Sequence, residues 1–238
     1  MLSFDDGPAP ISTPYILDQL HGIKNCAGNP VRAAFFLIGK DKSGSRPFDI
    51  WSCEKKIHLP FGSRLRDDMC PDPGVVGNSE IVRAIENAGH YVFVHGEHHA
   101  DLSRLSTAGV ESEVLGCYQD LLEAGARPLK FFRPPYLSNP AIASNSILVK
   151  ENWRIISGTP SGDGSPFATE GSLTESCKKS IERAVAYPVV LIFHDFRGRP
   201  GRRLNFRKIV TALIDSNYEL EDFDPEKVSK PVGETPSH

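Results

Sequence analysis

Short apolar runs along this chain alternate with longer segments whose apolar residues recur every three or four positions. The short runs, bounded by polar and turn-forming residues, have the length of buried strands. The candidate strands are residues 2–4, 33–38, 91–94, 129–132, 153–157 and 189–193. The helical spacing covers residues 13–22, 78–88, 106–124, 173–185 and 207–216. This alternation predicts an α/β fold with parallel strands and outer helices.

Two stretches interrupt the alternation. The segment at about 40–77 is rich in Gly, Pro, Ser and charged residues, and it is long for an irregular segment inside a compact domain. We therefore expect an insertion over one face of the fold. Residues 225–238 carry Pro, Lys, Glu and Ser, which predicts a flexible tail. What remains is a single predicted domain at 1–224.

Composition narrows the class of protein. The 238 residues are 39% hydrophobic, enough for one domain with a sizeable core. A net charge of −3 gives no sign of a nucleic-acid or anionic membrane partner. No apolar run approaches the roughly 20 residues of a membrane-spanning helix, and no signal peptide is visible. Because the chain starts within a strand-like run, we expect that sequence before Met1 is missing or has diverged, so the absent signal says little about export.

The five cysteines do not suggest a cysteine metal site. None forms a CxxC pair or another short ligand spacing. Cys53 and Cys70 flank a polar segment and could form a disulfide in an oxidising compartment. Cys117 lies in a helical pattern and is predicted to be a small buried apolar residue. The redox compartment stays open.

Four polar motifs follow directly after candidate strands. They are Phe4–Pro8 (FDDGP), His95–His99 (HGEHH), Arg133–Tyr136 (RPPY) and Phe193–Asp195 (FHD). Parallel α/β barrels build their active sites at the carboxyl ends of the strands. Motifs far apart in the sequence are therefore predicted to meet at one mouth.

The first two motifs hold groups that can bind a metal ion. His95 and His99 are four residues apart, so a helical turn or tight loop directs both imidazoles to one ion, whereas His98 should point elsewhere. Asp6 would complete a three-ligand site with open positions, as in catalytic zinc centres. Adjacent strand side chains diverge, which leaves Asp5 free as a base. The simpler readings are a turn at Asp-Gly-Pro and a solvated histidine cluster.

The remaining motifs supply an orienting cation and an acid. Prolines after Arg133 stiffen the backbone, so this arginine can hold a carboxylate in a fixed charge-assisted bond. His194 ends a buried strand and is placed as a general acid or base, with Asp163 as a candidate to hold its imidazole. A stiff surface loop, a core histidine and a turn are the plain alternatives. A basic run from Arg197 to Lys208 is either solvated surface or a site for an anionic part of the substrate.

With these motifs assembled, the chain resembles the polysaccharide deacetylases of carbohydrate esterase family 4, the NodB-homology domain. The resemblance runs from Phe4 to about Phe223, with the motifs in the family's order, and includes the stretch 100–106 after the histidines. It implies a distorted (β/α) barrel and one divalent metal ion. Zinc is the expected ion, with cobalt or manganese as alternatives.

The resemblance also implies a role for each site residue. The metal ligands would be Asp6, His95 and His99. The catalytic residues would be Asp5 as base, Arg133 orienting it, His194 as acid and Asp163 tuning that acid. Pro135, Tyr136 and Ile192 would contact the substrate, the Tyr136 N–H as an oxyanion donor and Ile192 in the acetyl pocket.

The implied reaction is removal of N-acetyl groups from a polymer of N-acetylated sugars, with peptidoglycan ahead of chitin-type chains. Such a polymer implies action outside the cytoplasm; the oligomeric state stays open. O-deacetylation, cleavage of another small amide, and a non-catalytic glycan-binding module are the competing readings. Gly96 stands where the family usually has a Ser or Thr that braces the ligand loop, and Gly164 where it often has Trp. Without that Trp one wall of the substrate groove would be missing, and the segment at 40–77 could supply it.

Overall fold

The protein is described by a computed structural model that covers residues 1–10, 12–40, 74–165, 167–184, 187–195 and 204–232. Eight strands form one sheet in the order β6-β7-β1-β2-β3-β4-β5-β8. The strands are β1 (Leu2–Gly7), β2 (Ala34–Leu37), β3 (Tyr91–Val94), β4 (Phe131–Phe132), β5 (Arg154–Ile156), β6 (Thr159–Pro160), β7 (Leu191–His194) and β8 (Ser229–Pro231). All neighbours pair in parallel except β5 and β8, which are antiparallel.

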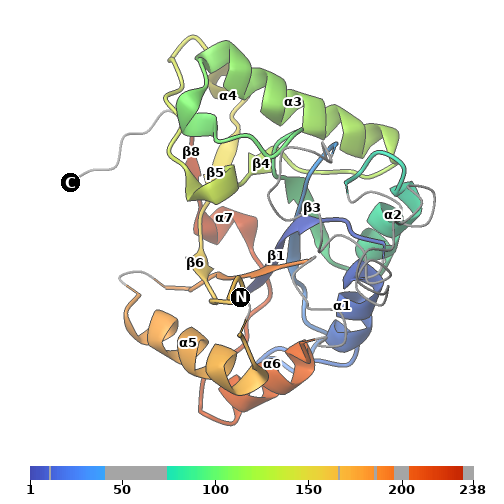
Figure 1. Ribbon diagram of the computed structural model, residues 1–238, viewed down its shortest axis with the longest axis vertical. Helices are drawn as coiled ribbons and strands as arrows, with labels where there is room; N and C mark the ends of the chain where they lie inside the picture. Colours follow the sequence, from blue (N-terminus) through green and yellow to red (C-terminus); the bar gives the residue numbers. More distant parts are fainter. Residues whose placement is uncertain (11, 41–73, 166, 185–186, 196–203, 233–238) are drawn as a thin grey trace, which may run out of the picture.

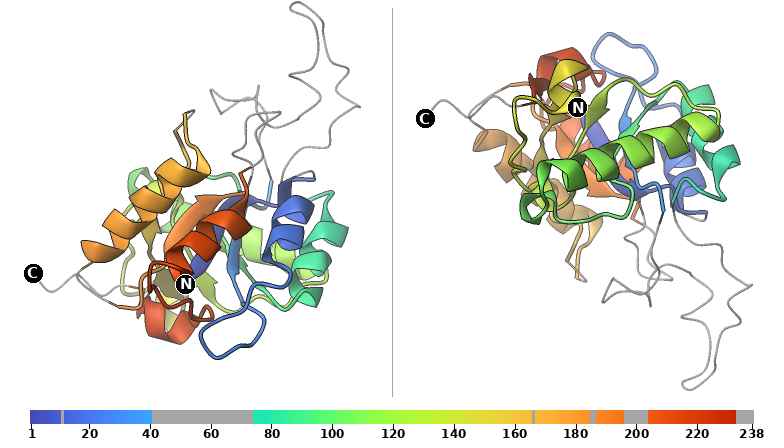
Figure 2. Two further views of the ribbon diagram at one scale, coloured as in Figure 1. Left: turned by 90° about the horizontal axis from the view of Figure 1, so that it is seen from below. Right: turned by 90° about the horizontal axis from the view of Figure 1, so that it is seen from above.

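Helices surround the sheet on its outer side (Figure 1). They are α1 (Ser12–Leu20), α2 (Ser79–Asn87), α3 (Thr107–Glu123), α4 (Ile147–Lys150), α5 (Glu170–Glu182), α6 (Phe206–Ile214) and α7 (Pro225–Val228), with short 3-10 turns η4 (Leu102–Arg104) and η5 (Pro135–Leu137). α7 lies instead at the end of the sheet where β1 begins, at the bottom of the left view and the top of the right view in Figure 2. β6 and β8 are the two ends of the strand order and do not pair with each other. The described structure is therefore a distorted (β/α) barrel that is open along one side.

The sheet buries side chains on both faces, as strands covered on both sides must. Its outer face packs against the helices, with Phe4 stacked on Phe35 and Phe193. Its inner face forms a second, smaller cluster around Phe36 and Phe93. The segment before α7 closes this cluster, since the ring of Phe223 contacts both of these phenylalanines.

The six candidate strands and five longer candidate helices of the sequence are all present, displaced by a few residues at their ends. The pattern missed β6, β8, α4 and α7, which have only two to four residues each. The prediction of a flexible tail from Pro225 is wrong for residues 225–232. Asp224 caps α7, and β8 pairs with β5, so this segment belongs to the same sheet.

Several expectations fall on residues that the structure does not describe. The predicted insertion lies largely in 41–73, and the predicted pairing of Cys53 with Cys70 falls within the same residues.

Cys117 is buried, as predicted, and its thiol donates to the Leu37 carbonyl at 3.2 Å. No helix among the described residues has the length and apolar character needed to cross a membrane. The single domain at 1–224 stays a prediction, to which β8 adds the strand at 229–231.

Candidate active site

The site begins where β1 departs from regular strand geometry. Asp5 pairs in register with Phe36 of β2 and with His194 of β7, and the β1–β2 register then shifts between Asp5 and Gly7. Asp6 occupies this irregularity with φ of 73°. Such a bulge re-aims side chains, so Asp5 and Asp6 do not simply point to opposite faces of the sheet, as regular strand geometry predicts. The sequence alone gave no sign of the bulge.

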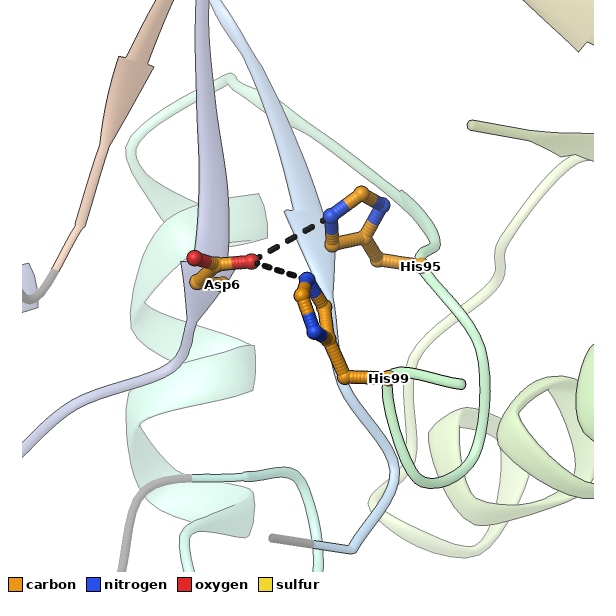
Figure 3. Close-up of side chains that lie close together, drawn as sticks. All are labelled: Asp6, His95 and His99. Carbon is orange, nitrogen blue, oxygen red and sulfur yellow. Dashed lines mark ion pairs between the residues drawn. The ribbon is translucent and has the colours of Figure 1, made fainter. Parts of the chain in front are cut away.

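The bulge brings Asp6 against the two histidines that follow β3 (Figure 3). Oδ1 of Asp6 lies 3.2 Å from Nε2 of His95 and 2.9 Å from Nε2 of His99. These three residues form a group whose ligand atoms all lie within 4.8 Å of one another. The side chains are only 3–10% exposed. The structure therefore brings together the three residues predicted to bind a metal.

The donor atoms of this group fit a divalent cation. Nδ1 of His95 lies 2.8 Å from the Arg133 carbonyl, which can only accept, so the hydrogen sits on Nδ1 and Nε2 offers a lone pair. Oδ1 of Asp6 is buried and accepts no well-aligned hydrogen bond from any described residue. Burial alone would raise the pKa of Asp6, but hydrogen bonds and positive charge from the imidazoles of His95 and His99, when these are protonated, hold it well below its usual value. Imidazole nitrogen and carboxylate oxygen are ligands that zinc prefers.

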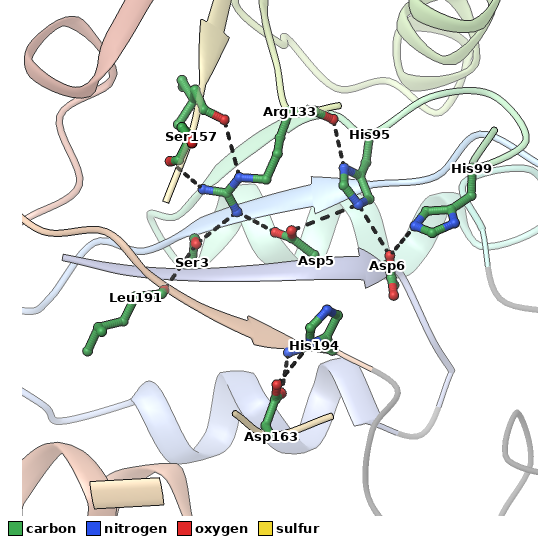
Figure 4. Close-up of polar contacts among 11 residues, drawn as sticks. Ser3, Asp5, Asp6, His95, His99, Arg133, Ser157, Asp163, Leu191 and His194 are labelled. Carbon is green, nitrogen blue, oxygen red and sulfur yellow. Dashed lines mark hydrogen bonds and ion pairs between the residues drawn. The ribbon is translucent and has the colours of Figure 1, made fainter. Parts of the chain in front are cut away.

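Arg133 holds the second carboxylate of the pair, Asp5, in a buried network (Figure 4). The Arg133 guanidinium is completely buried and donates to Oδ1 of Asp5. It also donates to the Ser3 hydroxyl at 3.0 Å and to the carbonyls of Ile156 and Ser157 at 3.3 and 3.2 Å. The other Asp5 oxygen lies 3.8 Å from Nε2 of His95. Asp5 is thus fixed beside the candidate metal site.

Sequence reasoning missed two supports of this arginine. Ser3 is fully buried, accepts from Arg133 and donates to the Leu191 carbonyl at 3.1 Å. The ring of Phe36 lies 3.8 Å from Cζ of Arg133, within cation–π range. Only their positions, one residue before Phe4 and at the centre of an apolar strand, could have marked them.

Tyr136 follows Arg133 in a strained turn. It has φ of 60°, the residue is 69% exposed, and its ring lies edge-on to His99 with centroids 4.7 Å apart. Pro135 before it is buried. Non-glycine residues with positive φ cost on the order of 1–3 kcal/mol and collect at functional sites. Among the described residues, six non-glycine residues have positive φ. Four of these six belong to or adjoin the motifs: Asp6, His99, Tyr136 and Leu137.

His194 lies on the other side of β1 from Arg133 (Figure 4). Asp163 accepts from the His194 backbone N–H at 2.6 Å and contacts its Nδ1 at 2.8 Å. Burial would lower the pKa of His194, but the hydrogen bond and charge of Asp163, with the charges of Asp6 and Asp5, raise it. Ile192, two residues earlier in β7, is buried, with Gly158 packed directly against it.

Asp195, for which the sequence predicts no catalytic role, is buried beside the site. It accepts from the hydroxyls of Ser12 and Thr13 at 2.9 and 2.6 Å. Its carboxylate fills the space where Gly7 would carry a Cβ. Burial raises its pKa to about 7 although the two hydroxyls oppose that shift. Asp195 therefore ties the end of β7 to the first turn of α1.

Of the cations in the basic run from Arg197 to Lys208, the structure describes Arg207 and Lys208, and the contacts of Arg207 lie away from the candidate site. The guanidinium of Arg207 donates to the carbonyls of Asp18, Gln19 and His21, where α1 ends. It caps a helix. Arg197, Arg199, Arg202 and Arg203 lie outside the described residues.

Comparison with known families agrees with this geometry. Residues 1–150 match the family described as polysaccharide deacetylase. The match covers more than half of the chain, which therefore belongs to that family and carries a NodB-homology domain of carbohydrate esterase family 4. This family is metal-dependent, and the group of Asp6, His95 and His99 is a candidate site for its ion.

Individual relatives are distant. A bifunctional xylanase/deacetylase from Pseudobutyrivibrio xylanivorans is 21% identical over 91% of this chain and 28% of its own length. A chitooligosaccharide deacetylase from Bradyrhizobium sp. (strain ANU 289) is 29% identical over 57% of this chain and 44% of its own length. The chain thus spans less than half the length of these relatives.

The fold has a clear match among solved structures. A family 4 carbohydrate esterase from Streptomyces lividans superposes with a TM-score of 0.65, 22% identity, and coverage of 96% of this chain and 94% of that one. At this identity the likeness concerns the fold, and it confirms the distorted barrel expected from the sequence.

Proposed function

We propose that this protein is a metal-dependent hydrolase that removes N-acetyl groups from a polysaccharide of N-acetylated amino sugars. The observation that carries the proposal is the buried contact of Asp5 with Arg133 beside the group formed by Asp6, His95 and His99. A base, an orienting cation and three metal-binding donors within one small volume are what acyl hydrolysis by water requires.

Asp6, His95 and His99 would hold the ion, with zinc expected and cobalt or manganese as alternatives. When bound, such an ion acts as a Lewis acid toward the acetyl carbonyl and lowers the pKa of water. Asp5 takes a proton from the attacking water, and Arg133 keeps Asp5 oriented for that transfer. The water oxygen bonds to the acetyl carbon as negative charge develops on the carbonyl oxygen.

The remaining residues complete the reaction. The backbone N–H of Tyr136 donates to the developing oxyanion, and Pro135 stiffens the turn that presents it. His194, held by Asp163, gives its proton to the sugar nitrogen as the C–N bond breaks, releasing acetate and a free amine. Ile192 would line the pocket for the acetyl methyl group.

Acetate release by an Asp5→Asn variant tests the proposal. We expect turnover to fall by roughly 10²–10⁴, the usual contribution of a general base, while zinc binding and glycan binding persist. Unchanged turnover in Asp5→Asn would refute the role of Asp5. Glycan binding without acetate release by the unaltered protein would favour a non-catalytic binding module.

The acyl substrate has a second candidate. Names of the matched proteins include an esterase and a xylanase/deacetylase, so O-acetyl groups on a polysaccharide are the alternative at the same site. Peptidoglycan is the first N-acetylated polymer to assay and chitin-type chains the second. Action on such polymers would place the protein outside the cytoplasm.

A further inference from the structure

The loop that carries both histidine ligands turns through two left-handed residues. Gly96 has φ of 86° and His99 has φ of 56°. A non-glycine residue keeps this conformation only where its surroundings over-determine it. On one side the loop is fixed by backbone hydrogen bonds, from Gly39 N to the Gly96 carbonyl at 3.1 Å and from Lys40 N to the Glu97 carbonyl at 2.6 Å.

On the other side the loop is fixed by Glu113 of α3. One carboxylate oxygen accepts from the His98 backbone N–H at 2.9 Å, and the other lies 2.9 Å from Nδ1 of His98. Glu113 is 8% exposed, so its carboxylate has lost most of its water and depends on these donors. His98 therefore points away from the candidate metal site, as the sequence predicts, and toward α3.

Gly96 leaves room for this contact. A Cβ at this position would lie 3.1 Å from Oε2 of Glu113, closer than ordinary packing allows. In this chain the carboxylate of Glu113 stands against the bare Gly96 backbone.

We propose that Glu113 is a positioning residue that sets His99 for metal binding by holding the preceding residue, His98, at its backbone N–H and imidazole. This inference rests on the proposed function, because it concerns the loop that would hold the ion. Glu113 touches neither the ion nor the substrate. It acts through one peptide unit, and removing it frees the left-handed turn that carries His99.

Zinc affinity of purified variants, measured by competition with a chromophoric chelator, tests this role. Glu113→Leu keeps the buried volume and removes both acceptors. We expect its affinity for zinc to fall roughly 10- to 100-fold, the usual effect of losing a group that orients a ligand. Glu113→Gln keeps one acceptor for the His98 N–H and should retain most of the affinity.

Glu111→Leu is the matched control. Glu111 lies on the same helix and accepts from the Ser146 hydroxyl at 2.7 Å and from Ile147 N at 2.9 Å, where α4 begins. Glu111→Leu removes the same kind of contact, but away from the loop that carries His95 and His99. We expect zinc affinity to be unchanged, whatever its effect on metal-free melting temperature. Equal loss of affinity in Glu111→Leu and Glu113→Leu would overturn the inference.

Two further outcomes decide the inference. Unchanged zinc affinity in Glu113→Leu, with tight binding by the unaltered protein, would overturn the role of Glu113 and leave the proposed function standing. No zinc binding by the unaltered protein would overturn both. If Glu113→Leu does not fold, Glu113→Met, which also removes both acceptors, replaces it. Weakened zinc binding would then support the inference, and unchanged binding would overturn it.

Discussion

The proton on His194 is held chiefly by Asp163, with a smaller contribution from the charges of Asp6 and Asp5. Asp163 is buried, and it contacts both the backbone N–H and the ring of His194. A carboxylate at hydrogen-bond distance favours the charged imidazolium. The raised pKa of His194 keeps it protonated toward neutral pH, the state that a general acid needs.

Asp163→Asn should therefore change the pH dependence of the reaction. Removing the charge lowers the pKa of His194, so the imidazolium is lost at lower pH. We expect the alkaline limb of the pH profile of kcat to move toward acid. Acetate release measured across pH for both proteins checks this, and an unmoved alkaline limb would exclude His194 as the acid.

The pair of Arg133 and Asp5 should be important for stability as well as for chemistry. Arg133→Met leaves the Asp5 carboxylate buried without its cation, and breaking a buried pair in this way costs about 3–5 kcal/mol. We expect the free energy of unfolding in urea to fall by that order. Adding Asp5→Asn should recover part of the loss, because no buried charge then remains. Additive losses in the double variant would contradict the coupling.

The residues of the site could be predicted from the sequence to the extent that their chemistry is unusual. Asp5, His95, Arg133 and His194 stand out because charged groups rarely follow apolar strands directly. Ser3 could not be found in this way. Its role depends on Arg133, 130 positions away, and a serine in a strand carries no signal of its own.

At the scale of elements, His90 joins β2 to β3. Its Nδ1 accepts from Ala33 N at 3.2 Å, one residue before β2, and Tyr91 N donates back to the Ala33 carbonyl. Burial, with the nearby charge of Arg32, lowers the pKa of His90 from 6.5 to about 4. The folded protein therefore holds this imidazole neutral.

Acid should weaken the fold through His90. Between pH 6.5 and about 4 the unfolded chain binds a proton that the folded protein excludes, so stability falls as pH decreases. From pH 7 to pH 5 this group should cost about 2 kcal/mol. His90→Gln, compared by urea unfolding at both pH values, should show a smaller loss. An equal loss in both proteins would contradict the assignment.

Two glycines should respond in opposite ways to alanine. In β1, a Cβ on Gly7 collides with the Asp195 carboxylate, and overpacking of this kind costs about 1–3 kcal/mol. In α5, a Cβ on Gly171 meets nothing within 4 Å, so Gly171→Ala should stabilise by about 0.5–1 kcal/mol through helix propensity. Thermal unfolding of both variants checks this, and a stable Gly7→Ala would contradict the packing described for Asp195.

Longer elements were predictable because their periodicity extends over several turns or a whole buried strand. The short ones were not, since β6 and α4 are too short for a pattern to be recognised. The bulge at Asp6 also left no pattern, because it depends on the register between β1 and β2. Polarity alone suggested a tail at Pro225, whereas pairing of β8 with β5 orders the segment that follows.

For the whole molecule, parallel pairing brings the chemistry together. β1, β2, β3, β4 and β7 run in one direction, so the ends of β1, β3, β4 and β7 deliver the four motifs to one mouth. The inner face of the sheet is covered by the smaller cluster that includes Phe223. The order of motifs predicted their convergence, but the distances within the site required the folded register.

The most direct test of the account is acetate release by the zinc-loaded protein from peptidoglycan and from N-acetylglucosamine oligomers, each with and without a chelator. We expect release that the chelator abolishes and added zinc restores, from at least one of the two substrates. Release that persists in the metal-stripped protein would contradict the role of Asp6, His95 and His99. No release from either substrate with zinc bound would contradict N-deacetylation.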